Sequence, residues 1–258
     1  MRNRMASLAI ALLSTLAWSF VLRAQTVAPR GTAEIPKTQS IVRVPDLSGF
    51  WGPGLRQGLN WDVPDLPMTP WGTEKFKAAR PPFGPRATFE DINDPVQLYC
   101  DPTGIPRIYN YPWQLTLLQT GNTVYILYEF SRIWRSVAMD RPHPKDPDST
   151  WLGDSIGKYE GDTLVVDTVG FNEKTWLDHP GHPHSDALHL IERFQRVDHD
   201  SLEVRITVDD PKAYTKSFSG RRVLQFSTSP MGEAICSMSE NESFKKQIMD
   251  PTTTPASK

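Results

Sequence analysis

Histidines and carboxylates are concentrated in one stretch of this 258-residue chain, residues 176–193. The stretch holds four of the six histidines, two aspartates and a glutamate, and two prolines with a glycine keep its first half in a fixed, non-helical path. Imidazole is the side chain that titrates nearest to neutral pH, and a carboxylate beside it fixes its tautomer. The stretch is therefore the candidate site for general acid–base chemistry.

A histidine held by a carboxylate is the smallest unit that performs this chemistry. The sequence offers His184 with Asp186 or Asp178, and His179 with Asp178, as catalytic residues. Substrate-binding side chains are expected to combine polar groups that orient an anion or a carbonyl with aromatic rings on strands. These residues are His182, Glu192, Arg132, Arg135, Trp134 and Tyr128. The alternative is that the histidines only brace the mouth of the fold.

The spacing of His182 and His184 also fits a metal site. Two imidazoles two residues apart on a strand converge on one ion, and Asp186 or Glu192 would complete the ligand set. Pro183 separates the two histidines, and no spacing fixes a third ligand. We therefore expect a site without a cofactor, and a transition metal on His182, His184 and Asp186 is the alternative.

The elements that must position this stretch are predicted to be strands. Three turns share one pattern, in which a polar residue, a Gly or His and an Asn or Asp precede Thr or Ser, as in hairpins; they are 119–124, 159–164 and 197–202. The predicted strands are 113–119, 123–129, 131–139, 154–159, 163–170, 187–197, 202–209 and 217–227. They predict an all-β fold, an antiparallel up-and-down meander that forms a barrel or a strongly curved sheet.

The strand predicted at 187–197 sets the direction of the site residues. If it begins near His184, then His182, His184, Asp186 and Glu192 share one face, and His189 lies on the other. The first set is the one expected to meet substrate.

A long Pro-rich arm, residues 46–112, precedes the meander (113–240) within one predicted domain, 46–240. It opens on a short strand around Trp51, and only residues 73–80, with Thr73 as cap, have helix-forming composition. The arm carries many aromatic residues, so we expect it to pack on the barrel.

The termini point to export. Residues 1–24 combine a basic start with an apolar run, as in a signal peptide, and an uncleaved anchor is the alternative. Residues 25–45 read as a flexible tether and 241–258 as a disordered tail. Cleavage changes 28 basic and 30 acidic residues to 25 and 30, a charge of −5, which excludes a nucleic-acid footprint. Without its first 24 residues, the chain has no segment for stable membrane insertion.

The two cysteines, Cys100 and Cys236, have only one possible pairing. A disulfide between them is expected in an oxidising compartment, such as the periplasm or the extracellular space.

Two resemblances add to these expectations. Trp51 in an opening strand followed by a meander resembles the calycin or lipocalin-like barrels. The segments 157–168, 176–178, 183–188 and 209–214 are similar to an uncharacterised family of exported bacterial proteins, over roughly Trp71 to Cys236. These resemblances imply export and an all-β fold, and they imply no activity.

The sequence thus predicts an exported enzyme that acts on a small, largely apolar organic substrate by His/Asp acid–base chemistry, in the isomerase, lyase or hydrolase class. A non-catalytic protein that binds or carries a small molecule is one alternative. A metalloprotein built on the histidine cluster is the other.

Overall fold

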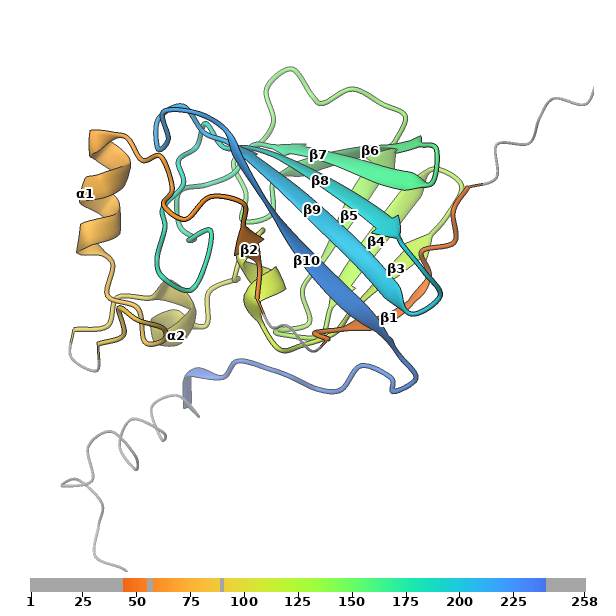
Figure 1. Ribbon diagram of the computed structural model, residues 1–258, viewed down its shortest axis with the longest axis horizontal. Coiled ribbons are helices and arrows are strands. Elements are labelled where there is room, and N and C mark those ends of the chain that lie inside the picture. The colour runs from red at the N-terminus through yellow and green to blue at the C-terminus, as the bar shows by residue number, and fades with distance from the viewer. Residues whose placement is uncertain (1–43, 55–57, 89–90, 240–258) are drawn as a thin grey trace, which may run out of the picture. The chain divides into compact units, whose positions relative to one another are not determined.

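Figure 1 shows the protein as a computed structural model, which describes residues 44–54, 58–88 and 91–239. The expected signal peptide (1–24), residues 25–43 of the expected tether and the expected tail (241–258) lie outside the described residues.

Ten strands of the described residues form one sheet. They are β1 (Gly49–Gly52), β2 (Asn60–Trp61), β3 (Leu115–Gln119), β4 (Thr123–Tyr128), β5 (Trp134–Met139), β6 (Asp154–Glu160), β7 (Thr163–Val169), β8 (His189–Arg196), β9 (Ser201–Asp209) and β10 (Phe218–Ser227). Because β1 pairs with both β3 and β10, nine strands close into a barrel, and β2 adds to β10 alone. The predicted all-β barrel is confirmed, as are the three predicted hairpins.

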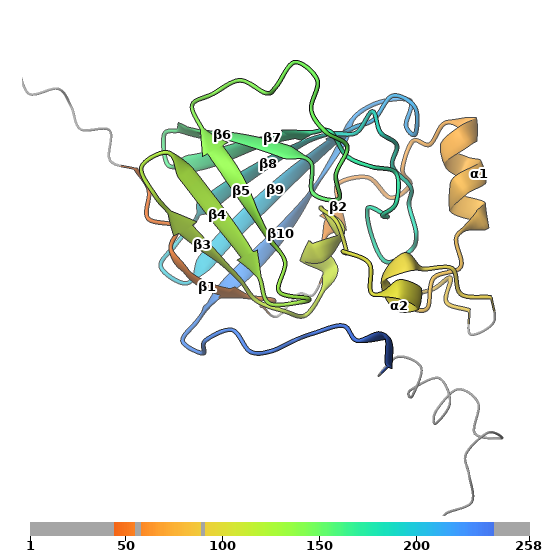
Figure 2. The ribbon, with the colours of Figure 1, turned by 180° about the vertical axis from the view of Figure 1, so that it is seen from behind.

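One pairing departs from the predicted antiparallel meander. Strands β5 and β6 run parallel, with Val137 opposite Ser155. Residues 140–153 connect them, and a connection of roughly a dozen residues or more is what a parallel pair needs. The long connection visible above the barrel in Figures 1 and 2 carries the chain back to the starting end.

The barrel interior is filled by side chains from alternate strand positions. In β9 these are Leu202, Val204, Ile206 and Val208, each completely buried. In β8, Leu190, Glu192 and Phe194 point inward, while His189, Ile191, Arg193 and Gln195 are only half-buried. The predicted alternation is confirmed within both strands, because successive residues of a strand point to opposite faces.

The arm forms two short α-helices and a 3-10 turn: α1 (Pro70–Ala78), α2 (Pro95–Tyr99) and η1 (Arg107–Asn110). Helix α1 begins before the predicted residue 73, because the Thr69 hydroxyl accepts from Gly72 N (3.1 Å) and Pro70 occupies the first turn. Both α1 and α2 lie beside one end of the barrel (Figures 1 and 2). The expected packing of the arm on the barrel is confirmed by Trp51, Leu66 and Tyr109 in the core.

The predicted disulfide is present between Cys100, which follows α2, and Cys236, beyond β10. It fixes the segment after the last strand to the arm. In the described part of the chain, every helix is too short or too polar to cross a bilayer.

Candidate functional site

The histidine stretch belongs to the connection between β7 and β8, beside α1. Leu177 N donates to His182 O (2.8 Å), and Trp176 pairs with Pro183, so residues 176–183 form a closed loop. Gly181 has φ +91°, and a Cβ there would lie 2.7 Å from Ala79 Cβ, so only glycine allows the loop to approach the arm this closely.

The strand β8 begins at His189, not near His184 as predicted. The residues before it follow the closed loop, where the two-residue alternation of a strand does not apply. The expected common face of His182, His184 and Asp186 is therefore wrong, and each of them has different surroundings.

Within the closed loop, the histidine held by a carboxylate is His182, through Asp178. Its Nδ1 lies 2.7 Å from Asp178 Oδ2, which also accepts from Trp61 Nε1 at 2.9 Å, and its ring stacks on Phe76 at 4.2 Å. Burial raises the pKa of the Asp178 carboxyl, but the hydrogen bonds from His182 and Trp61 outweigh it and hold that pKa below its usual value. This pair differs from the three pairs that the sequence suggested.

His184 is almost completely buried and pairs with a hydroxyl. Its Nε2 lies 2.6 Å from Thr175 Oγ1, and its Nδ1 lies 3.1 Å from Ser185 O. A carbonyl oxygen only accepts, so Nδ1 carries the proton, and Nε2 accepts the proton of the Thr175 hydroxyl. Burial lowers the pKa of His184, which favours this neutral imidazole.

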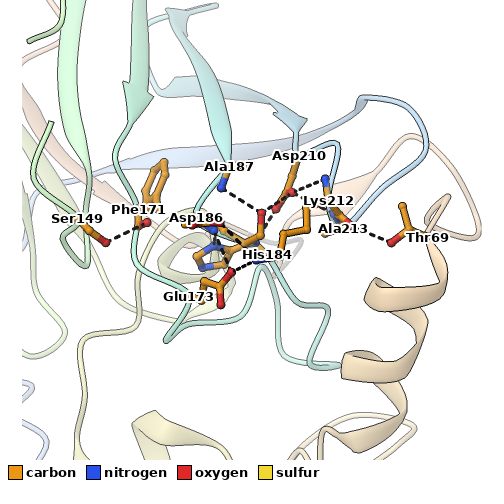
Figure 3. A network of polar contacts seen from close by, with 11 residues as sticks. Thr69, Ser149, Phe171, Glu173, His184, Asp186, Ala187, Asp210, Lys212 and Ala213 are labelled. Atoms are coloured by element: carbon orange, nitrogen blue, oxygen red, sulfur yellow. Dashed lines mark hydrogen bonds and ion pairs between the residues drawn. The ribbon is translucent and has the colours of Figure 1, made fainter. Parts of the chain in front are cut away.

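Asp186 lies away from His184. Its side chain is 68% exposed and lies 3.4 Å from Lys212 Nζ, which also binds Glu173 at 2.5 Å. Figure 3 shows the carboxylate that does support this segment, Asp210, which accepts from Ser185 N (2.6 Å) and Ser185 Oγ (2.7 Å). The expectation that Asp186 holds His184 is wrong.

His179, the other expected catalytic histidine, faces the arm. Its Nε2 lies 3.3 Å from Asn110 O, and its ring contacts Tyr111, with centroids 4.9 Å apart. Burial, followed by the charge of Arg107, lowers the pKa of His179. Among the described residues it makes no hydrogen bond to Asp178, so the suggested pair of His179 and Asp178 is not formed.

A pocket of about 200 Å³ opens between α1 and this connection. It is lined by Trp71, Lys75, Ala78, Ala79, Asn93, Glu173, Thr175, Trp176, Pro183 and His184. Thr175 and His184, both almost completely buried, are thus among the residues that line a small cavity with an aromatic and a charged part. Thr175 was missed from the sequence, because a threonine in a loop carries no spacing signal of its own.

Three of the expected substrate-binding residues meet instead inside the barrel. Arg135 Nη2 lies 2.7 Å from Glu192 Oε1, which also accepts from Tyr109 Oη at 2.5 Å, and Tyr109 reaches Tyr128 Oη at 3.3 Å. Burial lowers the pKa of Arg135, but the Glu192 charge outweighs it and raises that pKa above its usual value. The neighbouring cavity is lined by Tyr109, Tyr128 and Gln114 among others. Its volume of about 10 Å³ leaves room for one water molecule.

Two more of the expected substrate-binding residues, Arg132 and Trp134, lie on the outer surface. They line an open groove together with Trp151, and Arg132 forms an ion pair with Glu233. The expected substrate-binding residues therefore divide among three places: His182 at the loop, the buried barrel cluster and this groove.

A chain of imidazoles and carboxylates on the outer face of the barrel was also missed. His143 Nδ1 lies 2.7 Å from Asp154, and its Nε2 lies 3.1 Å from Asp167, which also binds His189 at 2.8 Å. The pairing of β6, β7 and β8 brings Asp154, Asp167 and His189 together, and His143 reaches them from the connection 140–153, so sequence spacing gives no sign of them.

The proposed metal ligands do not fit an ion. His182 is turned toward Asp178 and Phe76, His184 is bonded to Thr175, and Asp186 points to Lys212. Across residues 44–54, 58–88 and 91–239, no group of three or more histidine, cysteine or acidic side chains is arranged to hold a metal.

In comparisons with known proteins, no family model and no curated protein matches this chain.

Proposed function

We propose that this protein is an enzyme that hydrolyses small, largely apolar esters, with the Thr175 hydroxyl as nucleophile and His184 as general base. One observation carries the proposal: Thr175 Oγ1 lies 2.6 Å from His184 Nε2 in the wall of a pocket. A hydroxyl within hydrogen-bond reach of a base that a third group orients is the arrangement of an activated nucleophile. Here the third group is the Ser185 carbonyl.

The pair favours the hydrolase class over the isomerase and lyase classes. The lone pair on His184 Nε2 is directed at the Thr175 hydroxyl. His184 can therefore activate this hydroxyl as a nucleophile. A base for direct proton abstraction from a substrate would need that lone pair free.

The proposed reaction has two stages, formation of an acyl ester on Thr175 and its hydrolysis by water. Thr175 Oγ1 bonds to the substrate carbonyl carbon as its proton passes to His184 Nε2. The imidazolium then protonates the leaving alkoxide, which departs as an alcohol and leaves an acyl ester on Thr175. Water attacks this ester, giving its proton to His184, and the acid leaves as Thr175 regains its proton.

The pocket supports a small substrate with an apolar body. Its volume of about 200 Å³ is below the range of roughly 300–1,000 Å³ for drug-sized ligands. The indoles of Trp71 and Trp176 supply apolar surface, and Lys75, whose Nζ lies 5.6 Å from the Trp71 ring, supplies positive charge for a developing oxyanion.

Export forms part of the same proposal. The Cys100–Cys236 disulfide is of the kind that persists in oxidising compartments. The basic and apolar composition of residues 1–24 supports a secretory signal peptide.

The test uses p-nitrophenyl esters of acetate, butyrate and benzoate with four variants. Thr175→Val keeps the side-chain shape and removes the hydroxyl, and His184→Asn keeps a donor for the Ser185 carbonyl and removes the base. We expect each to lower kcat/KM by roughly 10²-fold or more, and Thr175→Ser to retain measurable activity. Thr116→Val is the matched control. Thr116 is also buried and its hydroxyl donates to Gly49 O (2.6 Å), but Thr116 does not line the pocket.

Wild-type activity in Thr175→Val would exclude Thr175 as the nucleophile. An ester analogue that binds to the wild type without any turnover would instead identify a binding protein, the alternative that uses the same pocket.

A further inference from the structure

An open groove on the outer surface offers a second ligand site. Its lining residues are Pro102, Arg132, Ile133, Trp134, Thr150, Trp151 and Leu152, and its volume is about 440 Å³. None of these seven residues lines the pocket of Thr175 and His184. The side chain of Trp134 stands out, since this residue is 58% exposed at the start of β5.

The walls of the groove are held by the backbone. Thr150 N donates to Gly170 O (2.9 Å) and Thr150 O accepts from Asn172 N (2.8 Å), so the segment that carries Trp151 is tied to the end of β7. Trp134 lies opposite Leu127 in the β4–β5 pairing. Both indoles therefore project from a backbone fixed before any ligand arrives, which lowers the entropic cost of binding.

The edges of the groove are polar. Arg132 forms an ion pair with Glu233, and the Lys174 ammonium lies 5.4 Å from the Trp151 ring. No acidic residue is among the seven that line the groove, and the Lys174 ammonium already lies against the Trp151 ring, so the lining does not favour a cationic ligand. Arg132 is the one charged residue among the seven, and Glu233 offsets its charge, so the lining itself has no net charge that would select an anion.

An open groove leaves one side of its ligand in water. A wholly apolar ligand would keep apolar area exposed there, and a wholly polar one would gain nothing from two indoles. The best match is a ring with apolar C–H faces and hydroxyl edges. We propose that the groove of Trp134 and Trp151 binds a neutral carbohydrate chain, with sugar rings packed on the two indoles. This inference does not depend on the esterase activity.

The test is a titration of the full-length protein with cellohexaose, chitohexaose and maltohexaose. Two-dimensional NMR spectra report the indole N–H groups of the tryptophans, which single substitutions assign. With at least one of the three sugars, we expect the signals of Trp134 and Trp151 to shift. Trp134→Ala and Trp151→Ala should each weaken binding by roughly 5- to 10-fold.

Trp113→Ala is the matched control, because Trp113 is 42% exposed but does not line the groove. Its affinity should equal that of the wild type, and melting curves should show all three variants folded. The proposal is overturned if none of the three sugars shifts the signals of Trp134 and Trp151. Unchanged affinity in Trp134→Ala and Trp151→Ala, or an equal loss in Trp113→Ala, would overturn it as well.

Discussion

The carboxylate of Asp178 binds His182 of its own loop, whose Nδ1 lies 2.7 Å from Asp178 Oδ2. The same oxygen accepts from Trp61 Nε1 of β2 (2.9 Å). Strand β2 lies on β10 at Gly220, where a Cβ would come within 2.7 Å of the Trp61 ring. One buried carboxylate thus fixes both the arm and the loop that precedes the pocket.

Replacing Asp178 by Asn should destabilise the fold by about 2–3 kcal/mol, because hydrogen bonds to a charged group contribute about 1.5–3 kcal/mol and two side-chain donors lose that charge. Urea unfolding followed by circular dichroism measures this change. Asp186→Asn is the control, since the Asp186 side chain is 68% exposed, and it should change stability by no more than about 0.5 kcal/mol. Equal effects of the two substitutions would contradict the role of Asp178.

The same carboxylate should contribute to acid sensitivity. Its pKa is lower in the folded than in the unfolded protein, so its stabilisation is complete above the unfolded value and is lost as the pH falls through the folded one. The free energy of unfolding of the wild type should therefore fall more steeply below about pH 4 than that of Asp178→Asn. Parallel curves for the two proteins would show that the charge of Asp178 has no such effect.

The buried pair of Arg135 and Glu192 should be strongly coupled. Arg135→Met and Glu192→Leu each leave a buried charge without its partner, which costs about 3–5 kcal/mol, while the double variant should cost less than their sum. A double-mutant cycle in urea measures the coupling. As a comparison, the exposed pair Arg205–Asp62 (42% and 45% exposed) should couple by less than about 1 kcal/mol. Additive effects of Arg135→Met and Glu192→Leu would contradict the prediction.

The strands were predictable because their signal is local. Alternation of apolar and polar residues places Leu202 to Val208 inside, and turn residues such as Gly161, with φ +63°, mark the hairpins. The parallel β5–β6 pair was not predictable in this way. It depends on the path that the connection of residues 140–153 takes, which tertiary packing sets and local sequence patterns do not encode.

The sequence singled out the histidine stretch but did not predict which side chains bind one another there. The density of titratable residues drew attention to His184, yet its partners Thr175 and Ser185 come from loop geometry that no periodicity encodes. Asp186, two residues from His184, is drawn instead to Lys212, which the β9–β10 turn brings alongside. Outside the regular strands, closeness in sequence did not predict which side chains bind each other.

The disulfide should contribute substantially to stability. It closes a loop over a sequence separation of 136 residues, and the chain-entropy model gives about 5 kcal/mol for a loop of this length. Since measured contributions are often smaller, Cys100→Ala with Cys236→Ala should lower the free energy of unfolding by about 2–5 kcal/mol. Guanidinium unfolding of the double variant and the wild type checks this, and mass spectrometry without reductant confirms the bond. Unchanged stability would show that the link is dispensable.

The pH dependence of ester hydrolysis should reflect His184. Burial lowers its pKa below the ordinary 6.5, and only the neutral imidazole acts as a base. Activity should therefore persist as the pH falls to 6.5 and be lost only below it. A profile of kcat/KM between about pH 4.5 and 8, with circular dichroism to confirm folding at each pH, tests this. An acid limb centred at or above pH 6.5 would be inconsistent with this buried base.

The proposed acyl ester on Thr175 can be trapped and located by acid-quench mass spectrometry. Protein mixed with p-nitrophenyl acetate is quenched in acid, digested and mapped. We expect an acetyl group on Thr175 of the wild type, little on Thr175 of His184→Asn, and none at position 175 of Thr175→Val. An unmodified Thr175 during turnover, or acetylation of another residue that persists in Thr175→Val and explains its activity, would show that Thr175 is not the nucleophile.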